Sequence, residues 1–229
     1  MRFLCLSDIH GHLGPLSAVL ATAERRGYDR ILVAGDICFP GPEPLSTWRR
    51  LGQLDALCVQ GVGDRALAAL DPTGLKPRDD YQRARLKRLI EVRDELGPQL
   101  LMRLAKLPQL ARHPLGGGRQ LLLVHGSPSD PLEPLTHDMS DAIIAKMLGD
   151  DPADVVLCGG SHLPFTRLVP RFSAPGVPAL TQVINLGSVG EAAGLSGPSQ
   201  AEHAHASFVE SSDDGIEVEQ FLVRLGKAA

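Results

Sequence analysis

The chain has 229 residues, of which 43% are hydrophobic and 22% are charged, and its formal net charge is −4. These proportions are ordinary for a globular protein and allow one large domain or two small ones. The net charge and the lack of long basic blocks argue against a nucleic-acid surface. Apolar stretches are too short to span a bilayer, and the N-terminal one is too short for a signal peptide, which predicts a cytoplasmic protein.

The cysteines give no sign of a disulfide framework or a structural zinc site. Their spacing contains no C-x-x-C pair, and three of the four lie inside apolar runs, where a free cysteine behaves as a small hydrophobic residue. We therefore predict free thiols in a reducing compartment. The four are Cys5, Cys38, Cys58 and Cys158.

Short apolar runs recur along the chain and predict β-strands. They are continuous rather than alternating, which suits sheets covered on both faces. Helical patterns over residues 14–27 and 43–54 lie between them, so strand and helix alternate as in right-handed βαβ units. The predicted strands cover residues 2–7, 30–35, 56–61, 120–126, 154–160 and 181–187.

Residues 81–107 repeat apolar residues at helical spacing, with a break at Gly97-Pro98. We predict two helices packed beside the sheet, forming a helical insert at about residues 78–112. Their many arginines and lysines are interpreted as a solvated face.

The last third of the chain is predicted to contain a loop and a β-hairpin. Residues 170–178 are rich in proline and predict a loop, whereas 206–211 and 216–225 predict two strands joined by a Ser-Asp-Asp-Gly turn. Because the chain has no internal repeat and no clear linker, we expect a single domain over residues 1–229.

Acidic residues and histidines follow several predicted strands directly. The carboxyl ends of parallel strands meet at one edge of a sheet, so these side chains are expected to converge. Carboxylate and imidazole together form a ligand set for Mn, Fe, Zn or Ni. Singly, an aspartate after a strand is more often a turn or N-cap residue, and a lone histidine more often a surface or core residue. The set that favours a metal site is Asp8, His10, Asp36, His125 and His162.

The order of these motifs resembles the calcineurin-like metallophosphoesterases, in particular their small bacterial phosphodiesterase branch. That family's pattern is Asp-x-His, Gly-Asp, Gly-Asn-His-Asp/Glu, His-Gly or Gly-His, and Gly-His-x-His. The corresponding stretches here are DIHGH (8–12), GD (35–36), GVGD (61–64), HG (125–126) and GGSH (159–162). The resemblance covers most of the chain, including the insert. It implies an α/β fold, a four-layer αββα sandwich of two mixed sheets.

Three motif positions depart from the family's pattern. Val62 stands at the family's asparagine, Gly63 at the adjoining histidine, and Gly160 at the first histidine of the Gly-His-x-His corner. None of the three side chains offers a metal donor. By the resemblance, the departures at Val62 and Gly160 bear on the second of the family's two metal ions, whereas the family's histidine at Gly63 is a proton donor to the leaving group or a phosphate contact.

By the resemblance, the first ion would be held by Asp8, His10, Asp36 and His162, all of which are present. The second would retain only the bridging Asp36 and His125. Two protein ligands rarely hold a divalent ion unless substrate completes the shell. We therefore expect one bound divalent ion rather than two.

Further residues near the motifs have competing interpretations. His125 and His12 are the candidates for acid–base catalysis, although His12 is more simply a solvated or hydrogen-bonding side chain. Cys38 is favoured as a packed residue over a metal neighbour, and Asp64 as a residue that fixes its turn. Candidate phosphate contacts are Gly126 and Ser188, and two further histidines, His203 and His205, are expected on the surface before a late strand.

Two functions stay open on the sequence. The favoured one is a metallophosphoesterase-fold protein with one intact metal site and weak or no phosphodiesterase activity, a pseudoenzyme that binds a phosphoester or a phosphate-like small ligand. The alternative is an active phosphoesterase, on diesters or monoesters, with one firmly bound metal and a second recruited by substrate. The sequence leaves the oligomeric state open, and a homo-oligomer is compatible with it.

Overall fold

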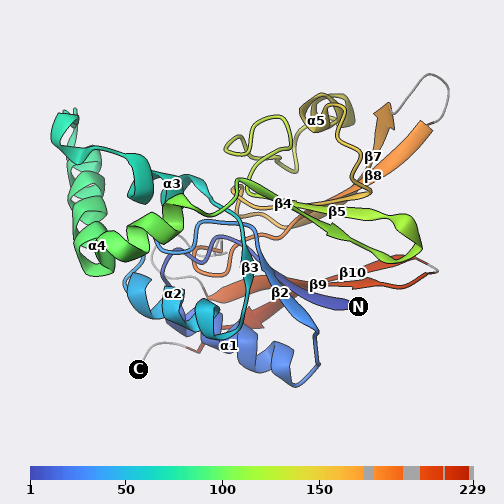
Figure 1. Cartoon of the computed structure of the whole chain (residues 1–229), viewed down its shortest axis with the longest axis horizontal. Helices are drawn as coiled ribbons and strands as arrows, with labels where there is room; N and C mark the ends of the chain where they lie inside the picture. Colours follow the sequence, from blue (N-terminus) through green and yellow to red (C-terminus); the bar gives the residue numbers. More distant parts are fainter. Residues whose placement is uncertain (173–177, 193–201, 214, 227–229) are drawn as a thin grey trace.

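The computed structural model describes residues 1–172, 178–192, 202–213 and 215–226. Its strands form two five-stranded sheets that lie face to face (Figure 1). The first has the order β10-β9-β1-β2-β3 and the second the order β4-β5-β6-β8-β7. The strands of the first sheet are β1 (Arg2–Leu6), β2 (Arg30–Val33), β3 (Leu57–Cys58), β9 (His203–Ser211) and β10 (Ile216–Arg224).

The second sheet is built from a later part of the chain. Its strands are β4 (Leu110–Pro114), β5 (Gln120–Val124), β6 (Val155–Cys158), β7 (Phe165–Phe172) and β8 (Pro178–Asn185). Both sheets are mixed. In the first, the parallel strands β1, β2 and β3 adjoin the antiparallel β9 and β10; in the second, the parallel strands β5, β6 and β8 are flanked by antiparallel β4 and β7. The predicted pair of mixed sheets is confirmed.

Helices cover the two outer faces (Figure 1). In the figure, α1 and α2 lie below the first sheet, α5 lies above the second, and α3 and α4 project to one side. The helices are α1 (Leu13–Glu24), α2 (Pro44–Gln53), α3 (Val62–Ala69), α4 (Asp80–Ala105) and α5 (Asp141–Leu148), with short 3₁₀ turns η1 (Pro72–Gly74) and η2 (Gly116–Gly118). No described helix is both apolar enough and long enough to cross a membrane.

The apolar core follows these layers. Residues such as Phe3 and Leu32 of the first sheet meet Leu121 and Leu157 of the second in one buried cluster. A second cluster joins the first sheet to α1, α2 and α4, and a third joins the second sheet to α5. The continuous apolar runs of the sequence are thus explained, because both faces of the central strands are buried.

The helical insert differs from its prediction at its end. Helix α4 spans the predicted pair of helices, and Gly97, at φ 69°, makes the expected break between them. Residues 110–114, the start of which we placed in the insert, instead form β4 against β5. The strand is short and at the sheet edge, with alternating half-buried residues, a weak signal beside a long helical pattern.

The proline-rich stretch also contains more strand than predicted. β7 runs through Pro170 to Phe172, and β8 begins at Pro178, so the predicted loop shrinks to residues 173–177, outside the described part. Pro170 pairs with Leu180, and β7 is an edge strand, the place in a sheet where a proline without an N–H is tolerated. Helices α3 and α5 were not predicted, since each is only eight residues long.

Candidate metal centre

Loops after four strands meet at one edge of the two sheets. Asp8 follows β1, Asp36 follows β2, His125 follows β5 and His162 follows β6. The first two loops are joined by backbone hydrogen bonds from Asp8 N–H to Gly35 and from His10 N–H to Asp36, at 3.1 and 2.8 Å. The convergence expected from parallel strand ends is therefore present in the structure.

The backbone at four of these residues lies in the left-handed region. Asp8, His10, Asp36 and His162 have φ values of 54°, 52°, 51° and 60°. Aspartate and histidine tolerate this conformation better than most side chains, yet it still carries strain, which clusters at functional sites. These loops are therefore held in place by surrounding contacts rather than by local preference.

Asp8 is the centre of the first ligand group. The atom Asp8 Oδ1 lies 3.2 Å from His162 Nε2 and 3.6 Å from His10 Nε2, and the two Nε2 atoms are 3.1 Å apart. Ligand atoms that each stand about 2.0–2.2 Å from one ion are separated by roughly 3.0–3.5 Å. The spacing of this group therefore suits a single bound cation.

The unused hydrogen-bonding capacity points the same way. Asp8 Oδ1 is buried and has no hydrogen-bond partner among the described residues, while Oδ2 accepts from Ser7 Oγ and the Gly160 N–H at 2.7 and 2.9 Å. A buried carboxylate oxygen without a partner is costly unless a cation or proton satisfies it. Asp8 thus has one oxygen fixed by the protein and one free for a metal.

His10 and His125 are both oriented by hydrogen bonds to backbone carbonyls. His10 Nδ1–H donates to the Phe39 carbonyl at 2.5 Å, and His125 Nδ1–H donates to that of Ala34 at 2.7 Å. Metal-ligating histidines usually hold their second nitrogen in this way, which fixes the tautomer and leaves the other nitrogen as donor to the ion. The residues present therefore fit a divalent cation, and the donor set suits Mn, Fe, Zn or Ni.

The second ligand group consists of Asp8, Asp36 and His125. Asp36 Oδ2 lies 3.7 Å from His125 Nε2, and its Oδ1 accepts from the Gly63 N–H at 2.7 Å. The sequence placed Asp36 in the first group as well, as a bridge. In the structure Asp36 is grouped with Asp8 and His125, and Asp8 is the residue common to both groups.

The charges of the two groups are mutually stabilising. Burial alone would raise the pKa of Asp8, but contacts with His10 and His162 outweigh it and hold that pKa well below its usual range. Burial would lower the pKa of His10, but Asp8, Asp36 and Glu191 raise it to about 9. His125 behaves likewise: burial lowers its pKa, and the nearby Asp36 and Asp8 carboxylates more than offset this.

Of the three positions that depart from the family's motif, Gly63 and Gly160 lie beside the second group. A Cβ built on Gly160, which has φ 75°, would lie 3.3 Å from His125 Nε2, so a side chain there would enter this group. A Cβ on Gly63 would lie 3.3 Å from Asp36 Oδ1. Val62, at the family's asparagine position, is 46% exposed. The backbone frame for further donors is thus present without the donors.

Supporting residues surround the ligands. Asp64 accepts from the Ile37 and Gly61 N–H groups at 3.0 and 3.1 Å, and burial together with the charge of Asp36 raises its pKa to about 6. This agrees with its predicted role in fixing the turn. Ser188 Oγ is buried and donates to the Asp8 carbonyl at 2.8 Å, and the Gly126 N–H donates to Pro131. A phosphate contact at either residue stays a prediction.

Other candidate residues lie outside the two ligand groups. His12 is half-buried at the start of α1, where it makes no side-chain capping bond, and its catalytic role stays a prediction. Cys38 is buried in the core with its Sγ 3.6 Å from the Pro44 carbonyl, and all four cysteines are free. The placement of His203 and His205 was wrong: both lie within β9, and both are half-buried because β9 is an inner strand.

Sequence reasoning missed Glu191, whose Oε2 lies 3.8 Å from His10 Nε2. Its backbone N–H donates to Ser188 Oγ at 2.8 Å, a serine-centred turn that directs the loop toward His10. The serine three residues before the glutamate was the available signal.

Comparison with known proteins gives the same fold and family. The model of the calcineurin-like phosphoesterase superfamily domain matches residues 1–207. The chain is 26% identical over 164 residues to the uncharacterized protein MJ0912 of Methanocaldococcus jannaschii, a match that covers 71% of this chain and only 63% of that protein.

Two solved structures share the fold over 99% of this chain and 89% of their own. They are hypothetical protein PH1004 from Pyrococcus horikoshii OT3, with a TM-score of 0.76 and 20% identity, and a metallophosphoesterase from Sphaerobacter thermophilus, with 0.73 and 24%. With a family model that spans nine-tenths of its length and a matching fold, the chain belongs to the calcineurin-like phosphoesterase superfamily.

Proposed function

We propose that this protein binds one divalent ion firmly and a phosphoester beside it, and that it hydrolyses phosphodiesters weakly or not at all. The observation that carries the proposal is the contrast between the two ligand groups. In the first, the Nε2 atoms of His10 and His162 lie 3.6 and 3.2 Å from the buried, unpartnered Asp8 Oδ1. The second lacks donors at Val62 and Gly160, where the family has them.

The proposed ligands of the firmly bound ion are Asp8, His10 and His162. Asp36 is the proposed bridge between this ion and the second ligand group. A bound ion would polarise a phosphoryl oxygen and lower the pKa of a coordinated water. Asp8 and Asp36 supply the negative charge that retains a cation in this buried position. His10 and His125 keep their Nε2 atoms available because carbonyl oxygens engage their Nδ1 atoms.

A second function is supported by the position of His125. Its ring is buried and oriented, with Nε2 3.7 Å from Asp36 Oδ2, although no complete set of protein donors surrounds it. Substrate oxygens could supply the missing donors and recruit a second ion. The alternative is therefore an active phosphoesterase in which the second metal arrives with the substrate.

Metal content and turnover distinguish the two functions. Elemental analysis of protein dialysed against Mn²⁺ should approach one ion per chain. Hydrolysis of bis(p-nitrophenyl) phosphate with added Mn²⁺ should stay far below the ordinary enzyme range of roughly 1–10³ per second. Turnover within that range, abolished by Asp36→Asn, would establish the alternative.

A restoration experiment tests the same proposal from the opposite side. The triple change Val62→Asn, Gly63→His and Gly160→His should raise the metal content toward two ions per chain and increase diester hydrolysis by about 10²–10⁴-fold. Gly160→His alone serves as the control for the strain of a side chain at positive φ. A folded triple variant that still holds one ion would argue against simple loss of ligands.

A further inference from the structure

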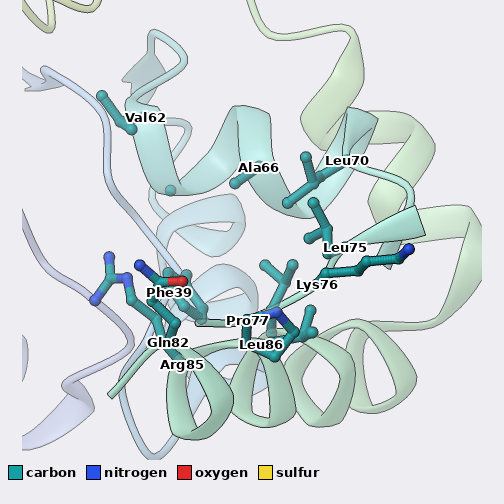
Figure 2. Close-up of a pocket in the computed structure, with 12 residues that line it drawn as sticks. Phe39, Val62, Ala66, Leu70, Leu75, Lys76, Pro77, Gln82, Arg85 and Leu86 are labelled. Atoms are coloured by element: carbon teal, nitrogen blue, oxygen red, sulfur yellow. The ribbon is translucent and has the colours of Figure 1, made fainter. Parts of the chain in front are cut away.

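A pocket of about 350 Å³ lies between α3 and α4 (Figure 2). Two of its lining residues adjoin the metal centre, because the Phe39 carbonyl accepts from His10 and the Gly63 N–H donates to Asp36. Figure 2 shows α3 along its upper wall and the first part of α4 along its lower wall. Its volume is at the lower end of the range for small-molecule sites. The pocket is therefore large enough for a ring or a short alkyl chain.

The wall of this pocket is predominantly apolar. Three of its residues, Val62, Leu70 and Leu75, are large apolar side chains that are 46%, 38% and 41% exposed. Leu70 and Leu75 face the pocket together with Leu86 of α4, whereas Val62, also in the lining, lies at the start of α3 with its side chain pointing away from them (Figure 2). Scattered exposed apolar residues are ordinary, but a concave group of them marks a binding site.

The pocket shares a wall with the second ligand group. Gly63 lines the pocket, and its N–H donates to Asp36 Oδ1 at 2.7 Å. A Cβ there would lie 3.3 Å from that oxygen and 3.4 Å from Phe39 Cβ, so a larger side chain would fill the space between pocket and carboxylate. Two of the three departures from the family's motif, Val62 and Gly63, thus line this pocket.

The polar groups at the pocket are cationic or neutral. Arg85 lies over the Phe39 ring, 4.8 Å from its centroid, and Lys76 and Gln82 complete the polar lining. Acidic side chains do not occur among the described residues that line it. Arg88 fixes α4 beside the site, because its guanidinium donates to the Pro40 carbonyl at 2.8 Å and to that of Gly41.

We propose that this pocket binds the apolar organic group of a phosphoester whose phosphate lies at the metal centre. The inference rests on the proposed function and specifies its ligand as an alkyl or aryl phosphate. The residues at two of the departing motif positions then have a positive role: Val62 adds apolar surface to the lining, and Gly63 leaves the space between the pocket and Asp36 free of a side chain. Arg85 and Lys76 add favourable charge for an anionic ligand.

Binding of n-alkylphosphonates to the Mn²⁺-loaded protein tests this pocket without relying on turnover. Methyl-, butyl- and hexylphosphonate, whose C–P bond is not hydrolysed, are compared with orthophosphate by isothermal titration calorimetry. Each methylene buried in the pocket should increase affinity by up to roughly fourfold, and hexylphosphonate should bind at least about tenfold more tightly than methylphosphonate. Equal affinities along the series would overturn the inference.

Two variants localise the effect. Ala66→Phe fills the pocket and should abolish the dependence of affinity on chain length, while orthophosphate affinity is unchanged. Leu75→Ser, at an exposed position, should weaken the dependence of affinity on chain length. Ala69→Phe is the matched control, since Ala69 is exposed on α3 and does not line the pocket. Unaltered chain-length dependence in both pocket variants would place the alkyl chain elsewhere.

Orthophosphate separates this inference from the proposed function. If the Mn²⁺-loaded wild-type protein fails to bind orthophosphate, the proposed phosphate site at the metal centre is wrong. If orthophosphate binds and the alkyl series is flat, the pocket assignment alone is wrong.

Discussion

The two ligand groups of this protein lie side by side around Asp8, yet they differ in their side chains. The first combines Asp8 with His10 and His162, and the second combines Asp8 with Asp36 and His125. The loop after β6 borders both groups, and its backbone has positive φ at both positions: His162 lies at φ 60° and Gly160 at φ 75°. The difference is therefore one of donors and not of frame.

This comparison teaches that a loop can present a metal-ligating side chain at one position and none two residues earlier. A Cβ on Gly160 would approach His125 Nε2, whereas the Val62 side chain lines an apolar pocket. At the first group, by contrast, the Nε2 atoms of His10 and His162 lie 3.6 and 3.2 Å from Asp8 Oδ1. The predictions below separate the tightly packed first group from the more open second one.

The neighbouring glycines of the Gly159-Gly160 corner should differ most in stability. A Cβ on Gly159 would collide with the Ser7 hydroxyl and lie 2.6 Å from Asp8 Oδ2, whereas one on Gly160 meets nothing closer than 3.2 Å. Gly159→Ala should lower the free energy of unfolding by about 3 kcal/mol or more, and Gly160→Ala by about 1–2 kcal/mol through its positive φ. Urea unfolding of the metal-free variants measures both, and equal losses would contradict the proposed packing difference.

Removal of one histidine from each group should change metal affinity unequally. Loss of an outer-shell partner already costs 10–100-fold in metal affinity, so His162→Ala should weaken Mn²⁺ binding by at least roughly 100-fold. His125→Ala should weaken the tight site by less than about tenfold, because His125 belongs to the other group. Competition against a metal-binding dye gives both affinities, and a larger effect for His125 would reverse the assignment of the groups.

His203 and His205 form a pair of histidines without a carboxylate, and they serve as a reference for the first ligand group. Their substitution should have the smallest effect on stability. The rings of His203 and His205 are 5.0 Å apart, the same spacing as those of His10 and His162. Burial and the neighbouring His203 lower the pKa of His205 to about 4, whereas the pKa of His10 is raised to about 9. The carboxylate, and not the proximity of two imidazoles, accounts for the opposite shifts.

The depressed pKa of His205 determines whether its contribution to folding stability rises or falls with pH. Between pH 4 and the usual histidine pKa of about 6.5, the unfolded chain binds the proton and the folded one does not, so stability should rise with pH. His205→Gln should make the rise of stability with pH less steep. The folding equilibrium constant should lose well under a factor of ten per pH unit, since the ring is partly exposed. Denaturant unfolding at pH 4.5 and 7 measures the change, and an unaltered slope would contradict the assignment.

Much of the site was visible in the sequence because its residues follow buried strands. Asp8, Asp36, His125 and His162 stand just after continuous apolar runs, and the parallel pairing of those runs brings their ends together. The same runs and the helical patterns between them predicted βαβ units, and the resemblance of the motif order to the family implied the αββα sandwich. These features depend on local spacing, which a single sequence records directly.

Other features depended on contacts between segments distant in the chain. The grouping of Asp36 with Asp8 and His125, the approach of Glu191 to His10, and the edge strands β4 and β7 all required the folded arrangement. The pocket between α3 and α4 was equally hidden, since α3 is short and its apolar face gains meaning only opposite α4. The sequence by itself determined which chemical groups follow each strand, because that is set by neighbouring residues. Only the tertiary structure decided which groups share a metal-sized space and which line a pocket, because those distances arise from the packing of whole layers.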